Sequence, residues 1–191
     1  MTQMIHFCDK ERCIACSSCV LACKVGHEIP VGVARRHVYI MEEGTPSERS
    51  FSVACRHCAE PYCLPVCPVD AISKREDGIV QTDKEACISC MSCLDACPFG
   101  IPAFWTDADN NVSPQEKCTY CAGGPNAEIF SEKEMELYGQ NRIAEGKVPL
   151  CAAMCATKAL VAGEINVIND LMEKRRARRF KTTEKPVGLG T

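Results

Sequence analysis

The cysteines of this chain limit how it can fold more than any other feature does. It has 17 cysteines in 191 residues, but only one Trp, four Tyr and six Phe to build a conventional core. All the cysteines except Cys8 fall into four groups, and each group ends in a C-x3-C pair. The groups are Cys13, Cys16, Cys19 and Cys23; Cys55, Cys58, Cys63 and Cys67; Cys87, Cys90, Cys93 and Cys97; and Cys118, Cys121, Cys151 and Cys155. Something other than a large aromatic core must therefore organise the interior.

The spacing within the groups predicts iron–sulfur ligation. Groups one and three share the run C-x2-C-x2-C-x3-C, and in groups two and three the last cysteine is followed by Pro68 and Pro98. Bacterial ferredoxins use this run, in which three close cysteines bind one [4Fe–4S] cluster and the fourth binds the neighbouring cluster. A short loop can direct three thiolates at one cluster, whereas its remaining corner needs a remote cysteine. We therefore expect a fourth ligand to cross between clusters.

Zinc and disulfide bonds are the alternatives to iron–sulfur ligation. Structural zinc sites pair two C-x2-C segments and close at four ligands, which fits tandem cysteine triplets poorly. The segment 1–12 lacks the apolar stretch and cleavage site of a secretory signal, and an odd cysteine count does not suit complete pairing. Cys8 follows a short apolar segment, so we interpret it as a buried hydrophobic residue and not as a ligand.

An internal repeat assigns the groups to modules. Residues 9–14 match residues 83–88, and residues 67–72 parallel residues 155–160. Groups one and three are therefore copies, and groups two and four are equivalent halves. Groups two and three are adjacent and form one module, so groups four and one must form the other. The two ends of the chain are consequently predicted to meet in space.

These relations predict an α+β fold with two ferredoxin-like modules, each holding two [4Fe–4S] clusters, with inserted hairpin and helical segments. Residues 55–97 form the contiguous module, and residues 1–54 with 98–191 form the split one. Crossing the fourth ligands gives four sets of cysteines. They are Cys13, Cys16, Cys19 and Cys155 for the first site; Cys23, Cys118, Cys121 and Cys151 for the second; Cys55, Cys58, Cys63 and Cys97 for the third; and Cys67, Cys87, Cys90 and Cys93 for the fourth.

Other elements follow from local patterns. We expect a hairpin over 71–82 turned at 76–78, strands at 36–41 and 51–54, a polar helix near 131–144 and an amphipathic helix over 164–180. The polar helix fits a solvated surface or a docking surface equally well. The basic residues that end the last helix suit the helix dipole better than a lipid or nucleic-acid site.

Charge and motif content exclude several function classes. The net charge is −3, so a basic surface for nucleic acid is not indicated. No stretch has the length of apolar sequence needed to span a bilayer. The four histidines, His6, His27, His37 and His57, are scattered, and no catalytic residue or phosphate-binding glycine motif is present. His57 lies between two cysteines of group two, and we interpret it as a structural or hydrogen-bonding residue.

The chain resembles a known family over nearly its whole length. Four cysteine groups in this order, the segment 55–63 and the split fourth group are typical of four-cluster iron–sulfur subunits that accompany molybdopterin or tungstopterin enzymes of the dimethyl-sulfoxide-reductase superfamily. Segments 118–125, 138–142 and 151–160 look most like those of formate dehydrogenase beta subunits. Some of those subunits carry a C-terminal membrane helix, and this sequence does not.

The resemblance implies electron transfer to or from a separate pterin-bearing catalytic subunit. Beyond it, the electron partner would be a membrane cytochrome or quinone-reactive subunit or a soluble redox carrier. The chain would stay in the cytoplasm or be exported together with a signal-bearing partner. The alternatives are the iron–sulfur subunit of a dimethyl-sulfoxide, nitrite, polysulfide or thiosulfate reductase, a free-standing polyferredoxin, and a zinc-binding interaction module.

Overall fold

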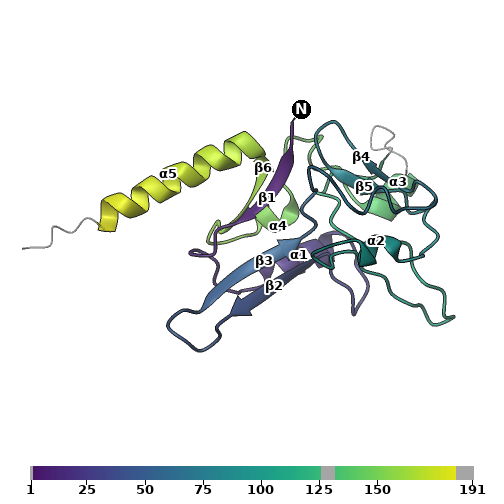
Figure 1. Cartoon of the computed structure of the whole chain (residues 1–191), viewed down its shortest axis with the longest axis horizontal. Helices are drawn as coiled ribbons and strands as arrows, with labels where there is room; N and C mark the ends of the chain where they lie inside the picture. The colour runs from purple at the N-terminus through teal and green to yellow at the C-terminus, as the bar shows by residue number, and fades with distance from the viewer. Residues whose placement is uncertain (1, 126–131, 184–191) are drawn as a thin grey trace, which may run out of the picture.

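The described part of the chain consists of four short helices, one longer C-terminal helix and three two-stranded antiparallel sheets, joined by long loops (Figure 1). The structure is a computed structural model, and it describes residues 2–125 and 132–183. The mixture of helix and strand agrees with the expected α+β class. The strands are only three to six residues long, so side-chain contacts must hold the loops in place more than a continuous sheet does.

The first sheet joins the two ends of the chain. Strand β1 (Met4–Cys8) pairs with β6 (Leu160–Glu164), so that Cys8 lies opposite Leu160. Asp9 extends the contact, because its backbone N–H donates to the carbonyl of Ala159 at 2.9 Å. The predicted meeting of the N- and C-terminal regions is therefore confirmed.

The other two sheets are hairpins. Strands β2 (Arg36–Met41) and β3 (Arg49–Ala54) pair over their full length, and β3 begins two residues earlier than the sequence predicted. Strands β4 (Ile72–Lys74) and β5 (Val80–Thr82) form the predicted second hairpin. Its turn is closed by a 2.9 Å bond from the Gly78 N–H to the Arg75 carbonyl. Gly78 has a φ of +81°, a conformation that glycine adopts without steric cost.

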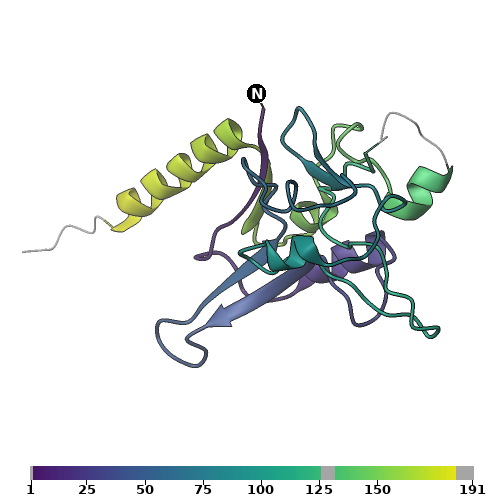
Figure 2. The same cartoon turned by 45° about the vertical axis from the view of Figure 1, so that its right-hand side comes forward.

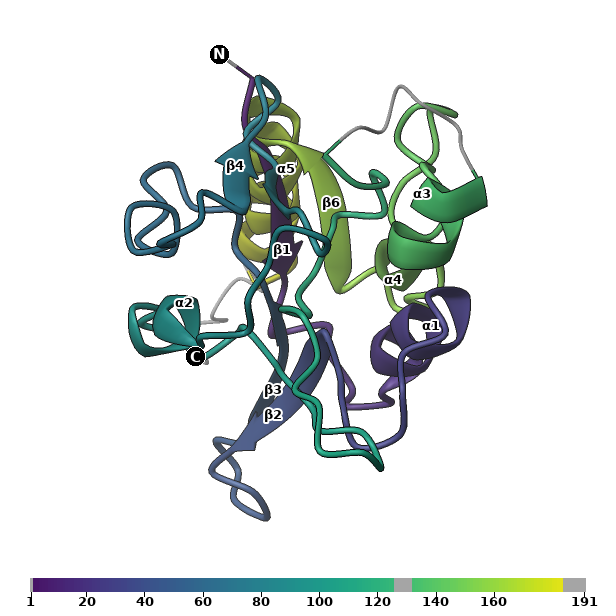
Figure 3. The ribbon, with the colours of Figure 1, turned by 90° about the vertical axis from the view of Figure 1, so that its right-hand side faces the viewer.

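Three short helices carry cysteines. Helix α1 (Ser18–Gly26) holds the last two of group one, α2 (Ser92–Asp95) holds Cys93, and α4 (Leu150–Ala153) holds Cys151. Helices α1 and α4 pack against each other, and Figure 3 shows them side by side, away from α2. The contact brings the first and fourth groups together, as the repeat requires.

Two further helices lie at the periphery. Helix α3 (Glu132–Tyr138) is shorter than the predicted polar helix, and the residue after it, Gly139, has a φ of +79°. Position 131 lies outside the described residues. Helix α5 (Ile165–Thr183) confirms the C-terminal helix and projects from the body of the molecule (Figure 2). Its residue Arg179 donates two 2.7 Å bonds to the carboxylate of Asp9. Part of the basic run therefore docks the helix.

The apolar interior is divided into four small clusters, and three of them contain cysteines. The largest consists of Cys19, Cys151, Cys155, Ala159 and Leu160. Because each cluster is small, we infer that the cysteine side chains contribute much of the packing in the interior. Within residues 2–125 and 132–183, no helix combines the length and apolar character that crossing a membrane requires.

Candidate iron–sulfur sites

Three members of the first predicted set lie where the two ends of the chain meet. Cys19 and Cys155 are buried in one apolar cluster, and Cys13 packs against it. Cys16 lies at the exposed tip of the loop, and its Sγ is 3.4 Å from the hydroxyl of Ser18. The loop 13–19 thus lies beside Cys155, which comes from the opposite end of the sequence.

The second set surrounds a small cavity. Its four cysteines come from α1, from the loop before the insertion and from α4. The lining includes all four predicted members, Cys23, Cys118, Cys121 and Cys151. All four are buried, so this site is shielded from water.

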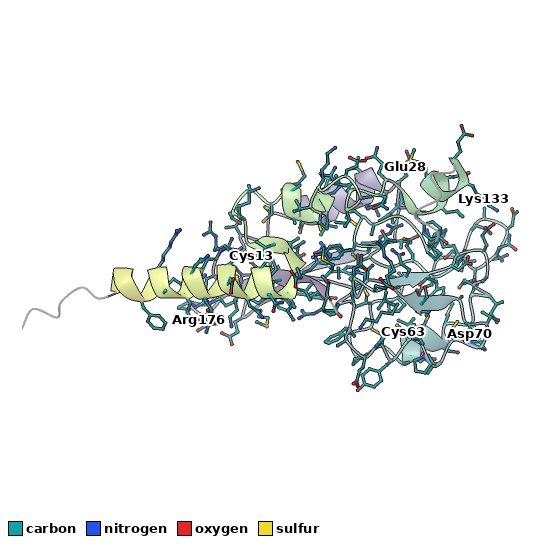
Figure 4. All side chains as sticks on the ribbon, turned by 90° about the horizontal axis from the view of Figure 1, so that it is seen from above. Cys13, Glu28, Cys63, Asp70, Lys133 and Arg176 are labelled. Atoms are coloured by element: carbon teal, nitrogen blue, oxygen red, sulfur yellow. The ribbon has the colours of Figure 1, made fainter. Side chains whose placement is uncertain are left out.

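The third and fourth sets also line cavities, and the cavity at the third set is the larger of the two. The larger is bordered by Cys55, Cys58, Cys63 and Cys97, and the smaller by Cys67, Cys87, Cys90 and Cys93. In Figure 4, Cys63 lies on the body far from α5, whereas Cys13 lies beside that helix. Cys13 of the first set and Cys63 of the third set therefore lie in different parts of the molecule.

The loops that carry these cysteines adopt a recurrent left-handed backbone conformation. Non-glycine residues with φ between +45° and +63° recur at equivalent places in the repeats. The equivalent pairs are Ala15 and Ser89, Ser17 and Met91, His57 and Tyr120, and Asp70 and Lys158. Such φ values are uncommon outside glycine and concentrate at functional sites. The repeat in sequence is thus also a repeat in backbone conformation, which we attribute to the need to turn several thiols and N–H groups toward one point.

The chemistry of these sites fits a cluster better than a single ion. Each has four thiols, the ligands that iron–sulfur clusters and zinc both accept. Four thiolates around one zinc ion approach it to about 2.3 Å and leave no space among them. The cysteines of the second, third and fourth sets instead stand around a cavity, as the ligands of a larger inorganic group would. The residues present therefore fit [4Fe–4S] clusters.

Hydrogen-bond donors point at several sulfurs. The side-chain amide of Gln115 lies 2.7 Å from Cys93 Sγ, and His27 Nε2 lies 3.2 Å from Cys121 Sγ. Backbone N–H groups reach other thiols at 3.3–3.4 Å, from Tyr120 to Cys118, Ala71 to Cys67, Gln115 to Cys87 and Leu160 to Cys155. Donors to sulfur stabilise thiolate charge and so adjust the reduction potential of a bound cluster.

The acidities of the thiols differ with burial. Burial raises the pKa of Cys63 to about 11 and that of Cys121 to about 12. Hydrogen bonds from the serine two residues later instead lower the pKa of Cys16 and of Cys90, both of which are exposed. Iron binds thiolates, so loading the buried positions must release protons.

Two buried histidines lie between the second and third sites. Burial lowers the pKa of His6 and of His57, so both rings are neutral at physiological pH. The His57 Nδ1 atom accepts the N–H of Val80 at 3.0 Å, which agrees with a structural role. His6 Nε2 lies 3.5 Å from Cys118 Sγ. Potential metal-ligand atoms of His6, His57 and Cys118 lie within 4.8 Å of one another, yet Cys118 already belongs to the second set.

A buried ion network supports the second site from outside. Glu116, which is 3% exposed, pairs with Arg35 and accepts a 2.8 Å bond from Lys84 Nζ. Lys84 also donates to the carbonyl of Leu137 at 2.8 Å, and its N–H donates to the hydroxyl of Tyr138. This network ties α3 to the segment that carries Cys118.

Sequence reasoning missed the charged residues buried near the cysteines. Arg36 and Lys117 are 1% and 4% exposed, and they line the second and third cavities respectively. Neither belongs to a cysteine motif, and the usual expectation for a cation is the surface. The one available signal is position, because Lys117 directly precedes Cys118.

The fold and the four cysteine sets define a ferredoxin-like iron–sulfur protein. A family model described as a 4Fe-4S dicluster domain matches residues 48–130. The formate dehydrogenase iron-sulfur subunit of Wolinella succinogenes is 54% identical to the chain, over 93% of this chain and 89% of its own length.

More distant relatives have related names. The thiosulfate reductase electron transfer subunit of Salmonella typhi is 34% identical over 85% of this chain and 76% of its own length. The B subunit of the anaerobic dimethyl sulfoxide reductase of Escherichia coli is 33% identical over 86% of this chain and 75% of its own length. This protein belongs to the same family of iron–sulfur electron-transfer subunits of oxidoreductases. It is a non-catalytic subunit that binds 4Fe–4S clusters.

Proposed function

We propose that the chain is the electron-transfer subunit of a formate dehydrogenase, and that it holds four [4Fe–4S] clusters in two ferredoxin-like modules. The catalytic partner is a molybdopterin or tungstopterin subunit. The observation that carries the proposal is 54% identity to a formate dehydrogenase iron-sulfur subunit, and it is supported by the cavities that three of the predicted cysteine sets line. The dimethyl-sulfoxide and thiosulfate relatives are less similar, at 33–34%.

The residues of the candidate sites have different tasks in this function. When bound, a [4Fe–4S] cluster supplies a centre that takes up and gives back one electron. The sixteen cysteines outside Cys8 bind the clusters, and each fourth cysteine ties two sites of one module together. The apolar side chains Val80 and Phe104 line the third and fourth cavities and exclude water from them. The donors to sulfur, such as Gln115, stabilise negative charge at the sites.

The first experiment is anaerobic purification of the tagged chain from cells that also produce its native partners. We expect about sixteen irons and as many acid-labile sulfides per chain, with broad brown absorbance. A large molybdenum or tungsten protein should co-purify and reduce a dye with formate. Activity with thiosulfate or dimethyl sulfoxide but not formate would refute the assignment to formate dehydrogenase, and zinc without sulfide would refute the clusters.

A matched pair of variants tests the cysteine sets. Cys63→Ala removes a member of the third set, so the iron content should fall by at least about four per chain. Cys8→Ala removes a half-buried thiol outside the sets, so the iron content should stay unchanged. Equal iron loss in the two variants would contradict the proposed sets.

A further inference from the structure

Two cations are buried among the cysteine sets without a carboxylate partner. Arg36 is 1% exposed and Lys117 is 4% exposed. None of the ion pairs formed within residues 2–125 and 132–183 includes either residue. An unpaired charge removed from water is strongly destabilising, so a buried cation calls for a nearby anion. The groups that surround these two cations are cysteine thiols.

Arg36 lies between the first and second sets. Its Nη1 donates to Ser52 Oγ at 3.0 Å, and that hydroxyl is 3.3 Å from Cys19 Sγ of the first set. Its Nη2 is buried without a hydrogen-bond partner, and its side chain lines the second cavity with Cys118 and Cys151. Burial acts to lower the pKa of the Arg36 guanidinium, but the surrounding cysteines, Cys151 foremost, raise it above its ordinary value.

Lys117 lies between the second and third sets. Its Nζ donates to the carbonyl of Val80 at 2.6 Å and reaches the carbonyl of Cys118 at 3.5 Å. The side chain lines the third cavity beside Cys55 and Cys63. Its positive charge acts on these two thiols and on Cys118 of the second set. The second set is therefore flanked by both buried cations.

The fourth cavity provides the contrast. Its described lining contains Gln115 and Thr82 as the polar side chains other than thiols, and no charged residue. Gln115 donates a neutral hydrogen bond to Cys93. A change of charge at Arg36 or Lys117 should therefore have least effect here.

We propose that Arg36 and Lys117 are the counter-charges of the bound clusters and that they set the order in which the four sites are reduced. This inference rests on the proposed four-cluster function. Reduction adds one negative charge to a site, and a fixed cation held out of water favours the more negative state. The second site, flanked by both cations, is reduced first. Arg36 also raises the potential of the first site, and Lys117 that of the third.

The test is a redox titration of the purified complex, followed by electron paramagnetic resonance, for wild type, Arg36→Gln and Lys117→Gln. The signal that appears first in wild type should shift to lower potential in both variants. We expect at least a tenfold change in its reduction equilibrium, or about 59 mV for one electron. Each variant should shift one further signal, and the fourth site should respond to neither.

Two controls separate charge from structure. Arg56 is exposed but lines the third cavity, so Arg56→Gln should shift that site by much less than Lys117→Gln because water screens its charge. Arg36→Lys keeps the charge, so it should retain iron and potentials close to those of wild type. If Arg36→Gln loses iron and Arg36→Lys does not, the need for a counter-charge is supported.

Several results would overturn the inference. The first is that Arg36→Gln and Lys117→Gln shift the potentials of entirely different signals. The second is that neither variant shifts a potential although its iron content is full. The third is that the signal shifted in both variants is not the one that is reduced first in wild type. Loss of iron in both Arg36 variants would show that this residue acts through packing and would refute its role as a counter-charge. The titration of Lys117→Gln would then decide whether Lys117 has that role. Fewer than four clusters in wild type would instead refute the proposed function.

Discussion

The reactivity of Cys8 separates the one thiol outside the four sets from the sixteen inside them. Cys8 ends β1, and its Sγ accepts the N–H of Ser52 at 3.3 Å. It packs against the apolar cluster that contains Cys19 and Cys155. Burial, with a smaller contribution from the thiol of Cys13, raises its pKa from 9.0 to about 11. A free thiol is therefore present, but it is held in its unreactive protonated form.

The pKa shift gives the size of the effect. Alkylating reagents attack the thiolate, and a pKa two units higher leaves roughly a hundredfold less thiolate near pH 8. Because the pKa is raised, the thiolate fraction grows about tenfold per pH unit until the pH approaches 11. A thiolate bound to iron has no such dependence, since it holds no proton to lose.

The assay is alkylation of the native, cluster-loaded protein by iodoacetamide at a series of pH values, read by peptide mass spectrometry. We expect one slow modification, at Cys8, whose rate rises steeply with pH. The Cys8→Ala variant should show none and keep its iron. An inert Cys8 at every pH, with iron loss in Cys8→Ala, would make Cys8 a ligand and refute the reasoning. Rapid modification of a residue in one of the sets would remove that residue from the ligands.

The remaining predictions concern ion pairs and cluster removal. Glu116→Gln leaves the buried Arg35 and the partly buried Lys84 without a carboxylate, so it should cost about 3–5 kcal/mol, seen as a lower Tm. The exposed control Glu145→Gln should change stability by under about 0.5 kcal/mol. Burial acts to raise the pKa of Asp9, but the bond to Arg179 lowers it overall. Docking of α5 should therefore be fully stable above the ordinary carboxyl pKa and should weaken as the pH falls below it. Asp9→Asn should destabilise the docked helix by about 1 kcal/mol, seen as faster proteolytic release of α5 at neutral pH. Removal of iron should leave a chain that proteases degrade quickly, because three of the four apolar clusters contain thiols.

Much of this arrangement could be predicted because its causes are local. A C-x2-C loop brings its two thiols close together whatever the rest of the chain does. The match at 9–14 and 83–88 reappears as equal left-handed conformations at Ala15 and Ser89. The hairpins also follow from neighbouring residues, and the structure extends β3 by only two residues.

The charged interior could not be predicted because its causes lie far apart in the sequence. Asp9 meets Arg179 across nearly the whole chain, and no periodic pattern marks such a pair. Helix α3 stops at Tyr138, because Gly139 adopts a φ of +79°, and this ends a stretch that composition alone would continue. A buried Arg36 runs against the ordinary preference of cations for water.

Burial of cations beside thiols links folding to cluster loading. In the iron-free chain most of the thiols around Arg36 are protonated, because burial raises the pKa of Cys118 and of Cys151. The guanidinium is then a buried charge with too little compensation, and it opposes folding. Binding of iron converts the same thiols to thiolates, and the cation becomes stabilising. An apolar residue at position 36 should therefore favour the iron-free fold while lowering the potential of the loaded protein. If Arg36 is a counter-charge, an apolar substitution should stabilise the iron-free fold and lower the reduction potential. If Arg36 only fills space, the substitution should destabilise the iron-free fold and leave the reduction potential unchanged.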